Sequence, residues 1–359
     1  MKKRLTALGL LLCLLGCLLP SPGVRGAWTA VPSRHAFTVD GRYVRAEVYN
    51  IGGNNYFKLR DMAMLLKDTD AHFSVEYDSP SKTIIVGTGI DYEPVGGELS
   101  IGVDKSATCV PARHALKVNG QYADVQAYNL GGNNFYKLRD LGRLLHFYVG
   151  YDSVSDTAMI VSAYYVRRTD VSIPDENVSV WYEVPVFRGN TPAVRSINAD
   201  LQSVEAALAQ ELQSTRSLVS SPRPEDNLHH TWTATVDTFT DRLVSVTLAY
   251  DVQLGGTGSS GYDGFVYDAA TGGRLFLSDV LGGTEEAVKA SVAKALGEQY
   301  PELVNGAASD PRSTVRSMNV LDLDFSVVNG HAVVYFDQYE ISYGAAGALR
   351  VILSEPLVY

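Results

Sequence analysis

The chain contains a tandem duplication, and this feature constrains its fold more than any other. Residues 34–66 match residues 113–145 at a constant offset of 79, with 18 of the 33 positions identical. The best conserved string runs from Tyr49 to Asp61 and returns from Tyr128 to Asp140. An internal repeat of this kind indicates two copies of one structural unit. Whatever the first copy folds into, we expect the second copy to fold into as well.

Each copy predicts a small α+β unit. Asp40-Gly41 and Asn119-Gly120, flanked by β-forming residues, are hairpin turn signals, and the Gly-Gly-Asn-Asn strings are further turn signals. In the first copy, apolar residues at helical spacing over 59–66 predict a short helix. Alternation over 73–77 then predicts a strand. We assign residues 30–89 to the first stalk-like repeat and residues 90–163 to the second.

The repeat pattern ends before Tyr164, and the rest of the chain predicts a different α+β module. Apolar faces indicate two amphipathic helices, at Pro192–Leu218 and Glu285–Tyr300. Between and after them, alternating segments predict mainly antiparallel strands, with a last hairpin at Asn329-Gly330. The predicted fold class is therefore α+β: two duplicated β-rich units with one short helix each, then this C-terminal module. We divide the module into residues 164–254 and 255–359.

The N-terminus has the pattern of a secretory signal. Three basic residues precede an apolar run over 5–19, and Val24 and Gly26 are small enough to define a cleavage site after Gly26. We therefore assign residues 1–26 to a signal peptide and expect a secreted or envelope-associated protein outside the cytoplasmic membrane. An alternative is lipidation of Cys17 in a lipobox-like string, which would be the chain's only contact with a membrane.

Net charge limits the classes of binding partner, and cysteine content limits the disulfides that could form. Residues 1–26 contain four of the 30 basic residues and no acidic residue, so the remaining chain has 26 basic and 40 acidic residues, a net charge of −14. This disfavours nucleic acid and anionic lipid as partners. Cleavage after Gly26 would leave Cys109 as the only cysteine, so no internal disulfide could form. We expect Cys109 to act as a small apolar residue.

The sequence predicts no cofactor and no metal. Residues 256–261 spell a dinucleotide-binding fingerprint, but a strand rather than a helix is expected to follow. The seven histidines show no metal-ligand spacing. Asp322 and Asp324 are expected to share one strand face, with Asp337 and Glu340 near in sequence, so these acids could do acid/base chemistry. The alternative is that they are solvated strand residues.

Residues 30–163 resemble the copper amine oxidase N-terminal-like domain, or stalk domain, which recurs in exported proteins of Gram-positive bacteria. The string over 54–61, Asn-Asn-Tyr-Phe-Lys-Leu-Arg-Asp, is close to one common variant of that domain. The resemblance implies a non-catalytic stalk or adhesion module. Copper is not implied, because the catalytic domain of those oxidases needs three copper-binding histidines and a tyrosine processed to a quinone, and this sequence supplies no such set.

Residues 165–359 resemble a pair of uncharacterised domains in the extracellular part of a lysozyme-sensing anti-sigma factor. The same pair occurs as a non-catalytic segment of a peptidoglycan deacetylase. The chain departs from many of these relatives at residues 255–258, where Gly-Gly-Thr-Gly stands in place of a nearby histidine, so no role of that histidine carries over. The most specific strings are Leu277-Ser278-Asp279-Val280-Leu281 and Tyr339-Glu340-Ile341.

Two groups of residues are candidate binding sites. The duplicated asparagines could form two equivalent sites for a polymer such as a glycan, which would gain from avidity; the alternative is that they only make turns. They are Asn54, Asn55, Asn133 and Asn134. The second group is an aromatic and acidic stretch suited to a saccharide or a cationic protein; the alternative is an aromatic core strand with two exposed acids. Its candidates are Tyr339, Glu340 and Tyr343.

These observations favour an exported, non-catalytic envelope protein. In this hypothesis the repeats form a stalk, and the C-terminal module binds a cell-wall glycan or a basic envelope protein such as a lysozyme-like enzyme, which the acidic net charge would favour. The alternative is an envelope glycan hydrolase or deacetylase that uses the carboxylates of the C-terminal half. A third hypothesis is a purely structural spacer.

Overall fold

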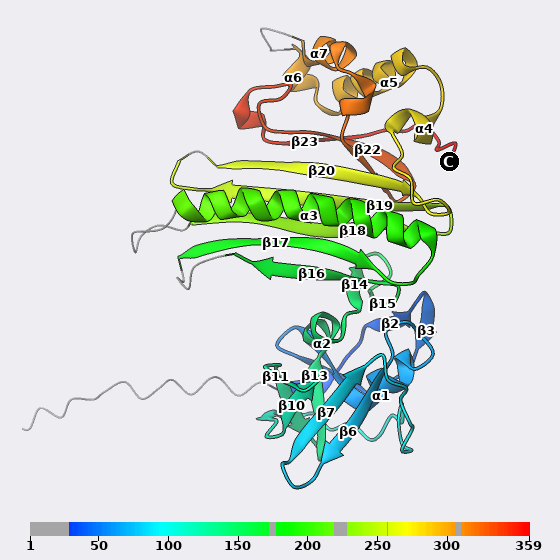
Figure 1. Cartoon of the computed structure of the whole chain (residues 1–359), viewed down its shortest axis with the longest axis vertical. Coiled ribbons are helices and arrows are strands. Elements are labelled where there is room, and N and C mark those ends of the chain that lie inside the picture. The colour runs from blue at the N-terminus through cyan, green and yellow to red at the C-terminus, as the bar shows by residue number, and fades with distance from the viewer. Residues whose placement is uncertain (1–28, 172–176, 219–227, 257, 306–309) are drawn as a thin grey trace, which may run out of the picture.

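The computed structural model describes residues 29–171, 177–218, 228–256, 258–305 and 310–359. Residues 1–26, assigned above to a signal peptide, lie outside this part of the chain. Two bodies are stacked along the longest axis, with the repeats in one body and the C-terminal module in the other (Figure 1). Helices and mainly antiparallel strands occur in both bodies, so the predicted α+β class is confirmed.

The two copies of the repeat exchange strands. Strand β2 (Ala36–Val39) of the first copy pairs in parallel with β15 (Thr157–Val161) of the second. In the same way, β7 (Thr83–Thr88) pairs with β10 (Ala115–Val118). Each of two four-stranded sheets therefore contains one hairpin from each copy. The other strands of these sheets are β3 (Arg42–Val44), β6 (Phe73–Asp78), β11 (Gln121–Ala123) and β14 (Tyr148–Asp152).

A seven-stranded sheet lies between the copies and shows their approximate two-fold symmetry. At its centre, β5 (Asn54–Lys58) and β13 (Asn133–Lys137) run antiparallel, and Phe57 pairs with Tyr136. These two residues are equivalent by the offset of 79, so the two-fold axis passes between them. The outer strands are β1 (Thr29–Pro32), β4 (Val48–Ile51), β8 (Ala107–Thr108), β9 (Val110–Pro111) and β12 (Ala127–Leu130).

The repeat body has one core to which both copies contribute. Helices α1 (Leu59–Leu66) and α2 (Leu138–Leu145) follow directly after β5 and β13 and bury their apolar faces together with Phe57 and Tyr136. The predicted hairpin turns are confirmed at Asp40-Gly41 and Asn119-Gly120, where all four residues have positive φ angles. This geometry is the type I′ turn that two-residue hairpins favour.

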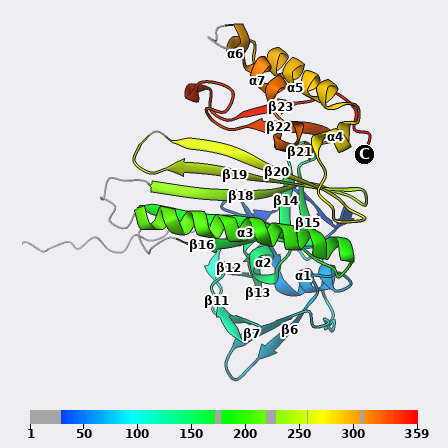
Figure 2. The same cartoon turned by 45° about the horizontal axis from the view of Figure 1, so that its top comes forward.

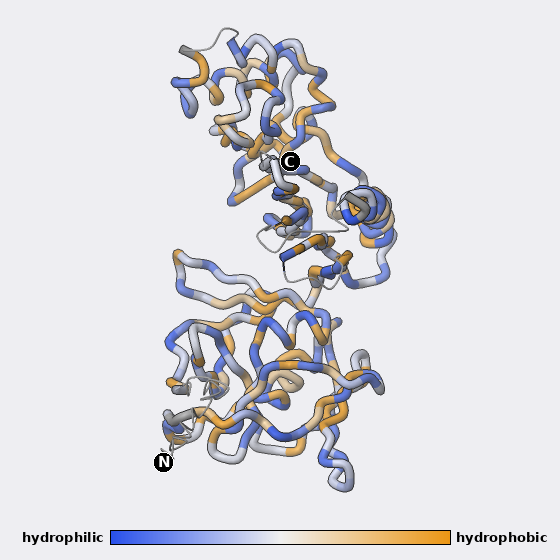
Figure 3. Tube along the Cα trace, turned by 90° about the vertical axis from the view of Figure 1, so that its left-hand side faces the viewer, coloured by the Kyte–Doolittle hydropathy of each residue, from blue (hydrophilic) through white to orange (hydrophobic). Residues whose placement is uncertain are grey.

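The C-terminal module begins with a five-stranded sheet that is covered on one face by α3 (Pro192–Leu218) (Figures 1 and 2). Figure 3 shows this helix end-on beside the sheet. Neighbouring strands are antiparallel except β17 and β18, which are parallel because the chain crosses the sheet through α3 between them. The strands, in spatial order, are β16 (Tyr164–Asp170), β17 (Val178–Phe187), β18 (Leu228–Phe239), β19 (Leu243–Gln253) and β20 (Ser259–Asp268).

The last part of the chain packs a three-stranded sheet against β20, and its four helices contact this sheet and one another (Figure 1). Gly264 makes this close approach feasible, since a Cβ there would lie 1.9 Å from the Phe325 carbonyl oxygen. The strands are β21 (Phe325–Val328), β22 (His331–Phe336) and β23 (Leu349–Ile352). The helices are α4 (Leu277–Leu281), α5 (Glu285–Gln299), α6 (Pro301–Asn305) and α7 (Pro311–Ser317).

One expectation about this region is wrong. Asp322 and Asp324 do not share a strand face, because Asp322 ends a 3₁₀ helix (Val320–Asp322) and Asp324 precedes β21. The side chain of Asn319 accepts a hydrogen bond from the Leu321 amide and so caps the 3₁₀ turn. This local capping interaction competes with an extended conformation.

Arg188 fixes the junction between the two bodies. Its guanidinium donates hydrogen bonds to the carbonyl oxygens of Asp70 and His146, at 2.6 Å each. Asp70 follows α1 and His146 caps α2, so one side chain from the end of β17 holds both copies of the repeat. Orphan carbonyls near helix C-termini are natural acceptors for such a cation.

Candidate binding site

Two pockets with corresponding linings lie on the repeat body, with volumes of about 410 and 340 Å³. Each pocket takes a histidine and an asparagine pair from one copy, and a tyrosine and a Lys-Leu-Arg string from the other. The lining residues correspond across the two-fold axis. The pairs are His114 and His35, Asn133 and Asn54, Asn134 and Asn55, Tyr77 and Tyr151, Lys58 and Lys137, and Arg60 and Arg139.

The strand exchange builds these pockets. Because β5 and β13 are antiparallel about the axis, the asparagines at the start of one strand lie beside the lysine that ends the other. Because β10 pairs with β7 and β7 pairs with β6, His114 just before β10 comes next to Tyr77 on β6. One copy alone therefore cannot form either pocket.

An aromatic pair is preserved in both pockets. The rings of Tyr77 and His114 meet edge to face with centroids 5.5 Å apart, and the rings of Tyr151 and His35 repeat this geometry at 5.5 Å. Tyr77 is 45% exposed and Tyr151 is 46% exposed. Each pocket therefore offers an accessible aromatic ring that is held in place by a neighbouring imidazole.

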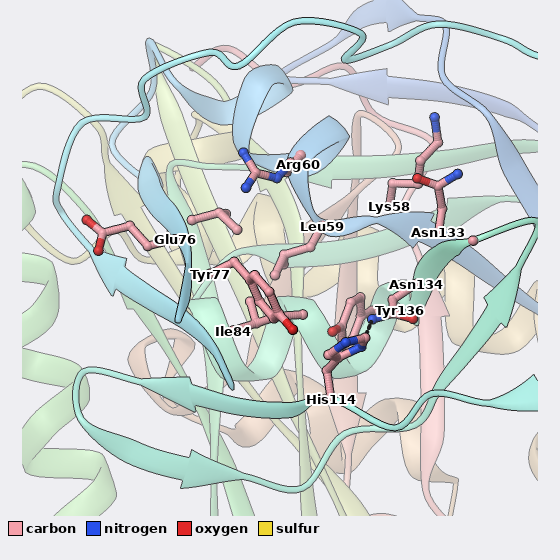
Figure 4. A pocket seen from close by; sticks show the side chains of 12 residues that line it. Lys58, Leu59, Arg60, Glu76, Tyr77, Ile84, His114, Asn133, Asn134 and Tyr136 are labelled. Carbon is pink, nitrogen blue, oxygen red and sulfur yellow. Dashed lines mark hydrogen bonds between the residues drawn. The ribbon is translucent and has the colours of Figure 1, made fainter. Parts of the chain in front are cut away.

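The first pocket is lined by neutral polar groups and by three charged side chains, Lys58, Arg60 and Glu76. Figure 4 shows Tyr77, His114, Asn134 and Tyr136 gathered in one place, with the Asn134 amide 3.0 Å from His114 Nδ1. The Lys58 ammonium lies 3.0 Å from a carboxylate oxygen of Glu47 and also pairs with Asp61. Burial alone would lower the pKa of Lys58, but these carboxylates outweigh it and raise the pKa. This cation is thus already paired.

A carboxylate, that of Asp156, contacts two residues that line the second pocket. Asp156 Oδ1 lies 2.7 Å from His35 Nδ1 and accepts a hydrogen bond from the Tyr151 hydroxyl at 2.5 Å. The hydrogen bond to Asp156 raises the pKa of Tyr151. Asn55 in this pocket accepts a hydrogen bond from the Ser33 hydroxyl at 2.9 Å. His35, Tyr151 and Asn55 are therefore held by partners within the protein.

The structure places the two groups of predicted site residues in different bodies. All four asparagines line the pockets of the repeat body. Tyr339, Glu340 and Tyr343 instead lie in the loop between β22 and β23, with Tyr339 63% and Tyr343 58% exposed. The Glu340 carboxylate accepts a hydrogen bond from the Asp337 amide at 2.7 Å, so it also shapes this loop.

Sequence reasoning did not single out the histidines and tyrosines of the pockets. The signal was present, because Arg34-His35-Ala36 recurs as Arg113-His114-Ala115 and Tyr77 recurs as Tyr151. A repeated polar or aromatic residue that a hairpin does not need is a better indicator of a site than a repeated Asn or Gly in a turn.

The C-terminal module contains a cluster of acidic residues, of which the sequence analysis identified only some members. Asp263 on β20 comes near Asp324 and Asp337, which precede β21 and follow β22. Burial, and then the charge of Asp324, raises the pKa of Asp263 to about 7. Burial, and then the charge of Asp337, raises the pKa of Asp324 to about 6. Sequence reasoning did not place Asp263 in this cluster because it lies 61 and 74 residues before the other two.

Within the described residues, no group of three or more His, Cys, Asp or Glu side chains is arranged to hold a metal ion. Cys109 is a buried free thiol, and burial raises its pKa. In the same part of the chain, no helix has both the length and the apolar character needed to cross a membrane.

Comparisons with known proteins show only weak structural similarity. No protein-family model and no curated protein matches the chain. A solved DUF3298 family protein from Pseudomonas aeruginosa PAO1 is 16% identical with a TM-score of 0.36, covering 53% of this chain and 88% of its own. A DUF3298 family member from Bacteroides fragilis is 13% identical with a TM-score of 0.40, covering 55% of this chain and 94% of its own. Likenesses this weak carry no argument about fold or function.

Proposed function

We propose that this chain is a non-catalytic binding protein of the cell envelope whose repeat body holds a hydroxyl-rich polymer, such as a cell-wall glycan, in its two pockets. One observation carries the proposal: the same histidine–tyrosine pair and the same asparagine pair are assembled twice about a two-fold axis. The stalk-domain resemblance of residues 30–163 agrees with a non-catalytic role.

The chemistry of the first pocket suits a sugar. A pyranose ring has an apolar C–H face and a rim of hydroxyl groups. The exposed ring of Tyr77 and an aliphatic wall suit the C–H face, and the side-chain amides of Asn133 and Asn134 suit the hydroxyl groups. Its volume of about 410 Å³ lies within the ordinary range for small-ligand pockets. Lys58 is neutralised by carboxylates, whereas Arg60 also lines the pocket and has one buried guanidinium nitrogen without a hydrogen-bond partner among the described residues, so a sugar with a negative charge could bind there as well.

Two sites on one body favour a repeating ligand. Each pocket alone would hold a short oligosaccharide with modest affinity, whereas a polymer that engages both would gain by effective concentration. The N-terminal signal pattern supports an extracellular location. The loop with Tyr339, Glu340 and Tyr343 is a second proposed contact surface, for a basic envelope protein such as a lysozyme-like enzyme, because the chain has a large acidic excess.

Glycan retention by variants of the exposed tyrosines tests the proposal. We expect residues 27–359 to be retained on purified peptidoglycan, Tyr77→Ala or Tyr151→Ala to weaken retention severalfold, and the double variant to abolish it. Tyr43→Ala is the matched control, because Tyr43 is equally aromatic and 74% exposed but does not line either pocket. Equal retention of the double variant and the control variant would refute the proposal.

A hydrolase or deacetylase acting on envelope glycan is the second candidate function. The raised pKa values of Asp263 and Asp324 favour it, since a carboxyl that is protonated near neutral pH can act as a general acid. Release of reducing ends or acetate from peptidoglycan, lost in Asp263→Asn, would support this candidate over the non-catalytic one.

A further inference from the structure

The two pockets differ at one buried position beside the two-fold axis. Tyr136 of the second copy is equivalent to Phe57 of the first, and the two residues pair directly across β13 and β5. Both belong to the shared core, with exposed fractions of 2% and 0%. Tyr136 lines the first pocket, where Figure 4 shows it close to His114 and Asn134. The second copy of the repeat thus has a hydroxyl group where the first copy has only a phenyl ring.

The Tyr136 hydroxyl has no hydrogen-bond partner within the described part of the chain. Burial raises the pKa of Tyr136 to about 12, and the side chain of Asn134, which approaches the hydroxyl without reaching hydrogen-bond geometry, acts in the opposite direction. A buried hydroxyl without a partner destabilises a fold, because it has lost its hydrogen bonds to water. Phenylalanine would remove this cost at position 136, as Phe57 shows at the equivalent position.

In the described part of the structure, His114 and Tyr77 of the first pocket have no carboxylate equivalent to the one that contacts His35 and Tyr151. In the second pocket, Asp156 holds both His35 and Tyr151. The equivalent position in the first copy is Lys82, which has the same left-handed backbone, with a φ of 51° against 53° for Asp156. The first pocket therefore keeps more hydrogen-bonding capacity for a ligand than the second.

We propose that the Tyr136 hydroxyl is a ligand-binding group and makes the first pocket the stronger of the two sites. The ligand would supply the missing partner through a hydroxyl or an acetamido carbonyl oxygen of a sugar. This inference rests on the proposed function, and it names one residue that distinguishes two related sites.

The substitution Tyr136→Phe tests the inference by calorimetric titration with the tetramer of N-acetylglucosamine. We expect the wild-type chain to show two classes of site, and Tyr136→Phe to weaken the stronger class about five- to tenfold, the usual effect of one lost hydrogen bond. The melting temperature of the variant should be equal or higher, because the unpaired hydroxyl is gone. A merely structural role predicts the reverse, a lower melting temperature with unchanged affinity.

Phe57→Tyr is the matched control, since it adds a hydroxyl at the equivalent position beside the second pocket. It should lower the melting temperature and leave the stronger class of site unchanged. Binding that Tyr136→Phe leaves intact would overturn this inference alone. Absence of binding by the wild-type chain to both the tetramer and peptide-free peptidoglycan strands would contradict the proposed function itself, and this inference with it.

Discussion

Equivalent residues of the two copies have different roles where their surroundings differ. Glu47 is buried and accepts hydrogen bonds from Lys105, at 2.7 Å, and from Lys58. Burial would raise the pKa of Glu47, but the two lysines outweigh it and lower the pKa. At the equivalent position of the second copy, Gln126 accepts a hydrogen bond from the Tyr56 hydroxyl instead. The ion pair of Glu47 and Lys105 occurs only in the first copy, because the segment that contains Lys105 lies against that copy.

Asp263 makes stability depend on pH. Its pKa is about 7 in the folded protein against 3.8 in a model peptide, so the folded state binds the proton more tightly than the unfolded chain. Its stabilising contribution is therefore full below about pH 4 and is lost as the pH rises through about 7. We expect the free energy of unfolding to fall between pH 5 and pH 8, and Asp263→Asn to recover about 1–2 kcal/mol of it at pH 8.

Urea denaturation at pH 5, 6, 7 and 8 measures this dependence. Asp68→Asn is the control, because the Asp68 side chain is 84% exposed. An Asp263→Asn curve parallel to the wild-type curve across this range would show that Asp263 does not titrate there.

Helix bounds and hairpin turns that depend on neighbouring residues could be predicted from the sequence. Contacts between elements that are far apart in the sequence could not. The apolar face over 192–218 became α3 with the predicted bounds, and the Asn-Gly and Asp-Gly signals became hairpins. Alternating strands show which face is buried but not which strand is the neighbour, so the exchange between β2 and β15 left no local signal. For the same reason the repeat pattern marks the four asparagines and the two tyrosines but does not show that they face one another.

The contact between β20 and β21 depends on the absence of a side chain at Gly264. A Cβ there would lie 1.9 Å from the backbone oxygen of Phe325, and backbone cannot swing aside as a side chain can. We expect Gly264→Ala to destabilise the chain by at least about 2 kcal/mol, as overpacking does. Gly256→Ala is the control, since its Cβ would meet nothing within 4 Å. Equal urea midpoints for the two variants would contradict this packing.

At the scale of the whole molecule, strand exchange makes the two repeats one body. Both four-stranded sheets and the core contain strands of each copy, and the pockets form only where the copies meet. Arg188 then ties this body to the C-terminal module through carbonyl oxygens near the ends of α1 and α2. A duplicated sequence has thus produced a single platform with two related sites rather than a string of independent units.

An amide NMR titration of residues 27–359 with the tetramer of N-acetylglucosamine tests the central claim most directly. The account predicts shifts first at Asn133, Asn134 and Tyr77, and at higher concentration at Asn54, Asn55 and Tyr151 across the two-fold axis. Shifts confined to the loop with Tyr339 and Tyr343, or none at millimolar concentrations of the sugar, would contradict it.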